Sequence, residues 1–330
     1  MFASRRMRMR IATLIVGLMV ASFSGNAQPA DKVLRIGVLL SFLAPGDEPP
    51  QAFRQRLSEL GYIEGKNITI EWRHADRGYD RLPELAAELV QLKSDVILTD
   101  VALATRAAMR ATPSTPIVMA IAADPVADGL VSSLARPGGN VTGVALMLPE
   151  TSAKRLQLLK DAIPKLSLVT ALWHPPTPWH KPMLSVATAA ASSLGLQLRP
   201  VSVNRADEFE SIFAVMKGNG TQAVLFGDNP YFSAHRARLL GLAARNQLPT
   251  IHTHKEWPAA GALMSYGPNY VDMFKLAASV VAKVLMGANP ADIPVEQPTR
   301  FEFVINLRTA KALGLTIPPA VRLQATEVIN

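Results

Sequence analysis

The 330-residue chain contains no cysteine, so it cannot be a small scaffold held together by disulfides. Glycine is limited to 20 residues and does not recur at every third position, which excludes a collagen. Charged residues make up only 18% of the chain and hydrophobic residues 49%, which excludes a disordered chain. What remains is a globular protein, and at roughly 150 residues per domain the length predicts about two domains.

Positive charge is concentrated at the N-terminus. Arginines at positions 5, 6, 8 and 10 precede an apolar run, Ile11–Phe23, and the small residues Gly25 and Ala27 follow it. This order is typical of a secretory signal peptide, and we expect cleavage after Ala27, with cleavage after Ala30 as the alternative. An uncleaved membrane anchor is disfavoured, because the run is shorter than the roughly 20 residues that span a bilayer.

Export to the periplasm fits the rest of the composition. Without a cysteine at the cleavage site no lipid can be attached there, so we expect a free mature protein, and an oxidising compartment disfavours stray thiols. Removing residues 1–27 takes away four arginines and no acid, which lowers the formal net charge from +8 to +4. The remaining bases are interspersed with acids, as in residues 71–77, so we expect neither nucleic-acid nor membrane binding.

After the signal, short apolar strands alternate with amphipathic helices. The first series predicts strands at 34–40, 67–72, 95–99, 117–120 and 141–146, with helices between them that include one over 126–135. The second series starts near Pro149 and predicts strands at 168–173, 197–203, 223–227 and 250–252. Such alternation is typical of parallel sheets covered on both faces. We therefore expect an α/β protein with one lobe over residues 28–147 and a second over 148–267.

Residues 268–330 are too many to be a tail. The pattern predicts a helix over 270–286, a strand over 301–305 and a helix over 307–313. We expect this segment to return across the lobe boundary near Gly267 and to belong mainly to the first lobe, with the position of the last strand left open. Segments that cross between two lobes more than once form a hinge.

Two glycine-rich motifs that suggest nucleotide binding fail on context. Gly218–Ala223 has the spacing of a dinucleotide fingerprint, but it ends a helix instead of opening one. Gly61–Asn67 follows a helix and lacks the Ser/Thr of a phosphate loop. We therefore expect no cofactor.

Metal and catalytic sites have weak support in the sequence. His252 and His254, with Asp228 or Glu256 as a third ligand, are a metal alternative, but no recognised ligand spacing accompanies them. Aspartates at the carboxyl ends of three predicted strands leave an exported hydrolase or isomerase as the enzymatic alternative, although no motif organises them as a pair. We expect neither a metal site nor catalytic residues.

Candidate ligand contacts follow the predicted strands, because open parallel sheets bind ligands beyond the carboxyl ends of their strands. These loops combine hydroxyls, carboxylates and aromatic rings, a set suited to a small polar ligand with a flat apolar part. Helix capping is the alternative role for the polar members, and Trp173 is equally suited to the core. The candidates are Ser41, Phe42, Asp100, Ala123, Asp124, Trp173, His174, Asp228, Tyr231, Thr253 and Tyr266.

Several stretches carry a resemblance to a known family. Arg35–Leu40 reads RIGVLL, Asp124–Val144 contains PGGNVTG, and Gly261–Asn269 ends in MSYGPN; Ala52–Leu98 and Pro294–Pro319 also contribute. Together they resemble the substrate-binding proteins of ABC transporters, in the group that includes tryptophan/tyrosine-type binding proteins. The sequence departs from the expected pattern at His174, where we expect an asparagine in relatives, and at Asp100, in a loop that is often rich in Gly and Thr.

The resemblance implies a type I-like periplasmic binding protein with two Rossmann-like lobes, parallel sheets and a multi-segment hinge. Its function would be to capture a small solute, such as an aromatic or other amino acid, by hinge closure and to deliver it to an ABC permease and its ATPase. We expect a monomer in which Ser41 and Thr253 hold a ligand carboxylate, Asp228 or Asp124 holds its ammonium, and aromatic residues of the loops contact its side chain. A periplasmic ligand sensor that docks on a receptor kinase is the alternative.

Overall fold

The computed structural model describes residues 33–330 without 77, 147 and 178. The expected signal peptide, residues 1–27, therefore lies outside the described residues. Within the described part of the chain, no helix combines the length and apolar character needed to cross a membrane.

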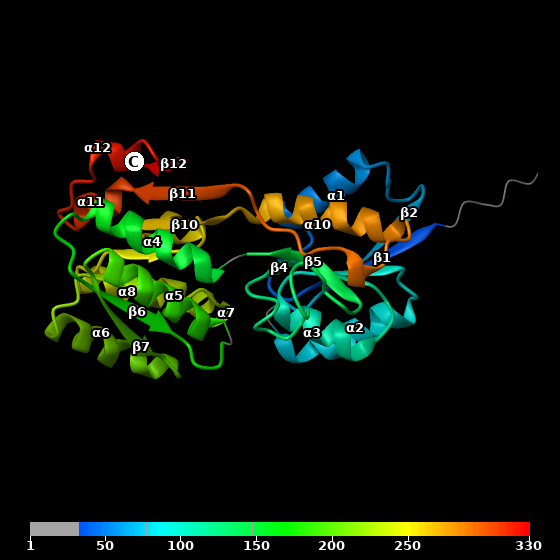
Figure 1. Cartoon of the computed structure of the whole chain (residues 1–330), viewed down its shortest axis with the longest axis horizontal. Helices are drawn as coiled ribbons and strands as arrows, with labels where there is room; N and C mark the ends of the chain where they lie inside the picture. Colours follow the sequence, from blue (N-terminus) through cyan, green and yellow to red (C-terminus); the bar gives the residue numbers. More distant parts are fainter. Residues whose placement is uncertain (1–32, 77, 147, 178) are drawn as a thin grey trace, which may run out of the picture. The chain divides into compact units, whose positions relative to one another are not determined.

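The first lobe is built on a five-stranded parallel sheet with the order β2-β1-β3-β4-β5 (Figure 1). Strands β3, β4 and β5 are buried along their whole length, as expected for apolar strands covered on both faces. The strands are β1 (Leu34–Leu40), β2 (Ile68–His74), β3 (Val96–Thr99), β4 (Ile117–Ala122) and β5 (Val141–Ala145).

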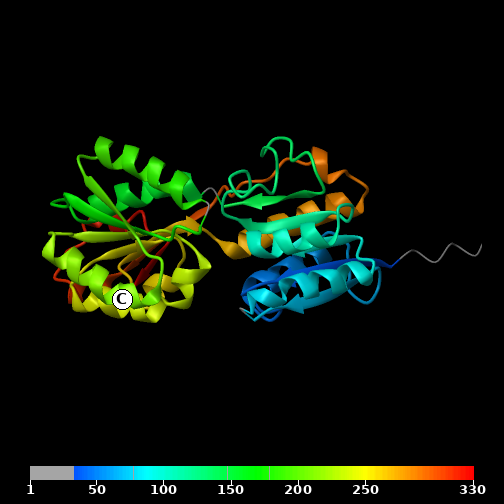
Figure 2. The same ribbon diagram turned by 90° about the horizontal axis from the view of Figure 1, so that it is seen from below.

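Two pairs of helices cover this sheet. Helices α1 (Glu48–Glu59) and α10 (Tyr270–Leu285) share one hydrophobic core with it. Helices α2 (Leu82–Gln91), which follows the short helix η1 (Tyr79–Arg81), and α3 (Ala102–Ala111) form a core on the opposite face (Figure 2). The sheet is therefore covered on both faces, and one of the covering helices comes from a distant part of the chain.

The second lobe is built on a seven-stranded sheet with the order β12-β11-β10-β9-β8-β6-β7. All its pairings are parallel except that of β10 with β11. The strands are β6 (Leu168–Trp173), β7 (Gln197–Ser202), β8 (Ala223–Phe226), β9 (Thr250–His252), β10 (Met264–Pro268), β11 (Phe301–Asn306) and β12 (Glu327–Ile329).

Helices again cover both faces of the second sheet. One face carries α4 (Leu148–Ala162) and α5 (His180–Ser193), together with α11 (Leu307–Ala312) and α12 (Pro319–Arg322). The other face carries α6 (Phe209–Gly218), which follows η2 (Ala206–Glu208), and then α7 (Pro230–Ala234), α8 (Arg236–Arg245) and α9 (Glu256–Ala259).

The chain passes between the lobes more than once, and the passages at residues 268–270 and 293–301 lie beside each other. Asn269 caps α10 by accepting hydrogen bonds from the backbone N–H groups of Val271 and Asp272. Its side-chain amide donates to Glu302 Oε1 at 2.7 Å, which ties the first passage to β11. The short helix η3 (Pro290–Asp292) remains with the first lobe, near β5.

The expectation that residues 268–330 belong mainly to the first lobe is wrong. Helix α10 packs on the first sheet, but β11 pairs antiparallel with β10 from Met264↔Ile305 to Pro268↔Phe301, and β12 pairs with β11. The alternation of strands and helices predicts a strand here, but it carries no information about which sheet edge accepts the strand.

The helix expected over 126–135 is also absent, and residues 125–135 form turns and bends. One helix-like turn forms when the N–H of Asp128 donates to Asp124 O at 2.9 Å. Gly129 then takes a φ of 68°, which a right-handed helix cannot contain. The turn therefore does not propagate.

Candidate functional site

A cavity of about 870 Å³ is lined by loops from both lobes, within the usual range for small-molecule sites. The loops follow the carboxyl ends of β1, β3 and β4 in the first sheet and of β6, β8 and β9 in the second. Five of the residues predicted from the sequence line this cavity: Phe42, Ala123, His174, Asp228 and Tyr231.

Ser41 and Asp100 lie behind the cavity wall and do not line it. Asp100 is fully buried, and its carboxylate accepts hydrogen bonds from the Ser41 N–H at 2.7 Å, the Ser41 hydroxyl at 2.9 Å and the Val101 N–H at 2.7 Å. The N–H of Phe42 also donates to it, at 3.3 Å. Burial raises the pKa of Asp100 against the opposing effect of these bonds. Asp100 thus braces the loops that carry Phe42 and Val101.

The other four predicted contacts, Asp124, Trp173, Thr253 and Tyr266, also lie outside the cavity lining. Asp124 accepts from the Ala127 N–H at 3.0 Å and so caps a turn. Thr253 is buried and accepts a hydrogen bond from Arg155. Tyr266 stacks on Phe301 with ring centroids 5.6 Å apart. Trp173, the last residue of β6, is half-buried. Position at a strand end is therefore insufficient to place a side chain in the cavity.

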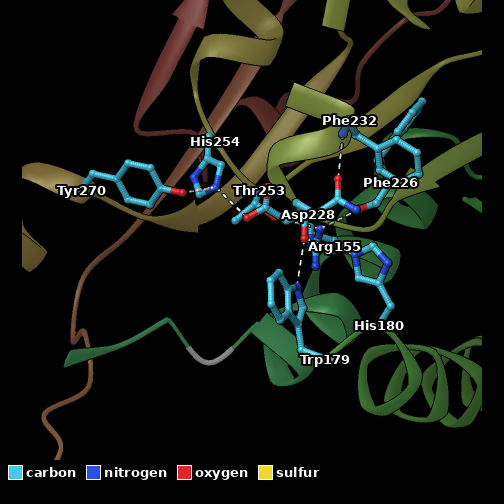
Figure 3. Close-up of polar contacts among 10 residues, drawn as sticks. Arg155, Trp179, His180, Phe226, Asp228, Phe232, Thr253, His254 and Tyr270 are labelled. Atoms are coloured by element: carbon cyan, nitrogen blue, oxygen red, sulfur yellow. Dashed lines mark hydrogen bonds and ion pairs between the residues drawn. The ribbon is translucent and has the colours of Figure 1, made fainter. Parts of the chain in front are cut away.

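The polar centre of the cavity is a chain of three side chains, two from the loops after β8 and β9 and one from α10 (Figure 3). Asp228 Oδ2 lies 2.8 Å from His254 Nε2, and the hydroxyl oxygen of Tyr270 lies 2.6 Å from the same nitrogen. Nε2 carries at most one hydrogen, which it donates to the carboxylate. Tyr270 and Asp228 thus compete for one donor, and the hydroxyl proton of Tyr270 is free to face the cavity.

Asp228 and His254 each favour the charged form of the other. Burial opposes the ionised state of Asp228, but attraction from His254 and then Arg155 outweighs it and lowers the pKa of this carboxyl. Burial likewise disfavours the imidazolium of His254, yet the charge of Asp228 outweighs it and raises the pKa of His254. The pKa of Tyr270 is raised well above its usual value by burial and by Asp228, so the phenol stays protonated. The result is a buried carboxylate that remains negative at neutral pH.

The backbone of Asp228 is fixed by two donors from α5 and the residue before it. Trp179 Nε1 donates to Asp228 O at 2.9 Å, and His180 Nε2 lies 3.1 Å from the same oxygen. The N–H of His174 donates to His180 Nδ1 at 2.8 Å, so the hydrogen of the neutral ring must be on Nε2, which donates to Asp228 O. Burial lowers the pKa of His180 to about 4, so the ring is neutral at pH 7.

Aromatic rings form much of the cavity wall. His174 stacks on Tyr231 with ring centroids 4.5 Å apart and planes 12° apart. Phe42, Trp179 and Tyr270 also line the cavity. The sequence reasoning misses Trp179, which lies well beyond the end of β6, and Tyr270, which follows β10, a strand that the sequence pattern does not predict. Each lies at the start of a helix, and this is the signal that marks them.

Cationic groups line the cavity from both lobes. Arg106 comes from α3 and donates from Nη2 to the buried Asp128 at 2.9 Å, which fixes its orientation. Arg236 and Lys255 come from the second lobe, and Lys255 lies 4.0 Å from Glu302. A cavity with a fixed carboxylate, a fixed arginine and aromatic walls can hold a small zwitterion with a flat apolar part.

The histidine pair considered as metal ligands is separated. The ring of His252 stacks against Phe226 and against Trp257, with centroid distances of 4.4 and 3.8 Å, while His254 bonds to Asp228. Among the described residues, no group of three or more His, Asp or Glu side chains is placed to hold a metal ion.

Comparison with known proteins gives consistent matches. Residues 45–329 match the family model described as ABC transporter substrate binding protein. A tyrosine-binding protein of Clostridioides difficile (strain R20291) is 28% identical over 269 residues, which cover 82% of this chain and 77% of that protein.

Two solved structures are similar over nearly the whole described chain. The crystal structure of an ABC domain in complex with L-Trp from Streptococcus pneumoniae has a TM-score of 0.82 at 26% identity and covers 90% of this chain and 99% of that one. The ligand-free, open structure of a substrate-binding protein with adhesive properties from Clostridium difficile has a TM-score of 0.72 at 23% identity, with coverage of 90% and 99%. The latter is a likeness of fold.

Proposed function

The chain belongs to the family of ABC transporter substrate-binding proteins, and from this premise we propose that it captures an amino acid with an aromatic side chain and delivers it to an ABC permease. Its two α/β lobes have the type I-like periplasmic binding protein fold. The family is a class of binding proteins rather than of enzymes. What the proposal adds is the chemistry of the ligand, the residues that hold it and the delivery to a membrane partner.

The observation that carries the proposal is the ionised, nearly buried carboxylate of Asp228 on the cavity wall. Its side chain is 13% exposed, and its Oδ2 is bonded to His254. His254 pairs with this carboxylate through Oδ2, and a ligand ammonium would be a second partner that reaches it from the cavity. The negative charge at this point thus favours a primary amine over a neutral sugar or an anion.

The aromatic walls supply the second part of the ligand chemistry. A flat side chain would stack against the His174–Tyr231 pair or against Trp179, which are held in place by their own contacts. The similarity to a tyrosine-binding protein and to a protein solved with L-Trp supports an aromatic amino acid. We favour tryptophan and tyrosine over aliphatic amino acids.

The ligand carboxylate would be held by Arg106. Among the described residues that line the cavity, Arg106 is the arginine from the first lobe. Its bond to Asp128 holds the guanidinium in place before the ligand binds. Asp228 belongs to the second lobe, so a zwitterion held by both residues would favour the state in which the lobes are closest. Binding would then shift an existing equilibrium toward closure by its differential affinity for the closed state.

Delivery and location complete the proposal. Proteins of this family act outside the cytoplasm, so we propose that residues 1–27 are removed during export and that the mature protein is a monomer of the periplasm. There its ligand-bound form would dock on the permease, whose ATPase drives import.

Calorimetry on ligand-stripped protein tests the amino-acid ligand. L-Trp, L-Tyr, L-Phe, L-Leu and glycine are titrated in turn, with L-Trp methyl ester and tryptamine as probes of the carboxylate. We expect L-Trp or L-Tyr to bind with a Kd of about 1 μM or tighter, and tryptamine to bind much more weakly. If no amino acid binds more tightly than about 1 mM, the proposal is wrong. Native mass spectrometry of freshly purified periplasmic protein checks for a retained ligand of matching mass.

A further inference from the structure

Arg155 is a fully buried arginine of α4 that lies behind the cavity and does not line it. Its Nη1 donates to the carbonyl oxygen of Phe226 at 3.2 Å and to the hydroxyl oxygen of Thr253 at 3.0 Å (Figure 3). Phe226 is the last residue of β8, and Thr253 directly follows β9. One guanidinium thus joins the carboxyl ends of two neighbouring strands.

These two attachment points flank the polar centre of the cavity. Asp228 follows Phe226 by two residues, and His254 is the residue after Thr253. Strands β8 and β9 pair in parallel at Val224↔Thr250 and Leu225↔Ile251, so the loops that leave them start side by side. The bonds from Arg155 therefore fix the spacing of the backbone segments that present Asp228 and His254 to each other.

The charge of Arg155 is costly to bury and poorly compensated within the fold. Among the described residues, Nε and Nη2 are buried without a hydrogen-bond partner, and no carboxylate lies within ion-pair distance. Burial lowers the pKa of Arg155 to about 10, with Asp228 acting in the opposite direction, so the group stays charged at neutral pH. Apolar side chains in place of a whole buried charge network are often neutral for stability, so stability alone does not require an arginine at this position.

We propose that Arg155 is a positioning residue for ligand capture: from behind the cavity it holds the β8 and β9 loops in register and keeps Asp228 negative for a ligand ammonium. This inference rests on the proposed function, since it assigns Asp228 to the ligand. Arg155 acts through Asp228 and His254 and makes no contact with the ligand itself.

The other charged and titratable groups around this pair define what Arg155 must add. Asp228 is faced by His254 from the β9 loop, by His180 from α5 and by the hydroxyl of Tyr270 from α10. Glu256 of α9 acts on His254. His180 is neutral at pH 7, so among the described residues the attraction that stabilises the Asp228 carboxylate comes from His254 and Arg155. Only Arg155 keeps its charge across the whole pH range in which His254 titrates.

The test compares Arg155→Met and Arg155→Lys with wild type. The control is Lys154→Met, which removes a charge from the same helix. Lys154 is half-buried, and among the described contacts its side chain bonds only Gln157. The Kd for L-Trp and L-Tyr is measured by calorimetry between pH 4 and pH 8, and thermal midpoints are recorded for each variant. Arg155→Gln is the substitute if the methionine variant does not fold.

We expect Arg155→Met to raise the Kd at pH 7 at least tenfold while the variant remains folded at the temperature of the measurement. We call the pH below which binding is lost the acidic limit of binding. This limit should move to higher pH, because Asp228 without Arg155 takes up a proton more readily. Arg155→Lys should restore part of the affinity and the acidic limit, and Lys154→Met should behave as wild type. A Kd within twofold of wild type in Arg155→Met overturns the proposal, and so does a weaker Kd with an unmoved acidic limit.

A ligand-independent measurement separates this inference from the proposed function. The imidazole resonances of His254 are titrated by NMR in wild type and Arg155→Met. Removal of the arginine should raise the pKa of His254, because Arg155 opposes its charged form. If no amino acid binds wild type, the proposed function fails; an unshifted His254 titration shows separately that Arg155 does not act on this pair.

Discussion

The hydroxyl oxygen of Tyr270 lies 2.6 Å from Nε2 of His254, and this contact joins the two halves of the molecule at the cavity. Tyr270 is the first residue of α10, whose apolar side packs on the first sheet. His254 follows β9 of the second sheet and is bonded to Asp228. A side chain anchored on one lobe therefore takes part in the electrostatics of a carboxylate on the other.

Removal of this hydroxyl should weaken ligand binding without unfolding the protein. Tyr270→Phe keeps the ring and removes the hydroxyl, whose proton is free to face the cavity. We expect the Kd for L-Trp to rise about threefold to tenfold, the effect of losing one net hydrogen bond. Calorimetry at pH 7 measures it. Tyr62→Phe makes the same change where the hydroxyl meets Ala282 O at 3.5 Å, and it should leave the Kd unchanged. Equal Kd values in both variants would show that the Tyr270 hydroxyl has no role in binding.

Loss of the charge of Asp228 should have the largest effect on affinity. Asp228→Asn keeps the size of the side chain and removes its charge, so we expect the Kd for L-Trp to rise about 100-fold or more, as for a broken buried ion pair. The control is Asp161→Asn, on α4 and outside the cavity lining. A rise in Kd of less than threefold in Asp228→Asn would show that the ligand ammonium does not bind at Asp228.

His180 should make the folded state sensitive to acid. The pKa of His180 falls from 6.5 to about 4 on folding, so below pH 6.5 the unfolded chain binds a proton that the folded chain does not. The contribution of the neutral ring to stability is therefore complete above pH 6.5 and is lost as the pH falls toward 4. Between pH 7 and pH 4 the free energy of unfolding should fall by about 3 kcal/mol less in His180→Gln than in wild type. Urea unfolding at several pH values measures this difference, and parallel curves for the two proteins would contradict it.

The brace at Asp100 should contribute to stability. Asp100→Asn turns one acceptor oxygen into a donor that faces the N–H groups of Ser41, Phe42 and Val101, so we expect a loss of about 2–4 kcal/mol in the free energy of unfolding. Urea unfolding at pH 7 measures it, with Asp161→Asn as the control. Because the loop of Phe42 lines the cavity, a weaker Kd for L-Trp should accompany the loss. A change below 0.5 kcal/mol, about the size of an ordinary surface effect, would show that the brace is not needed.

Much of the fold follows from local pattern. The apolar runs over Val96–Thr99 and Ala223–Phe226 are too short for helices and too apolar for exposed strands, so buried parallel strands are the expected outcome. The two-lobe α/β architecture follows from their alternation with helices. The sheet that Phe301–Asn306 joins cannot be predicted from this pattern, because a strand's own sequence does not specify its neighbour when two open edges are available.

The residues of the site could be predicted only in part. The rule that ligands meet the carboxyl ends of parallel strands places Asp228, Tyr231 and His174 at the cavity. It does not give the direction of a side chain, and Thr253 faces a buried arginine instead. Arg155 itself has no signal in the sequence, because a lone arginine within a helix is ordinarily a surface residue.

The bond between Asn269 and Glu302 constrains how the lobes can move. It lies where β10 and β11 end their antiparallel pairing at Pro268↔Phe301, so two of the connecting segments leave the second sheet as one hydrogen-bonded ribbon. A two-stranded ribbon bends across its width far more readily than it shears along its length, because shear would break the ladder. We therefore expect motion between the lobes to bend this ribbon rather than to slide its two segments past each other, and Glu302, which lines the cavity, belongs to the ribbon.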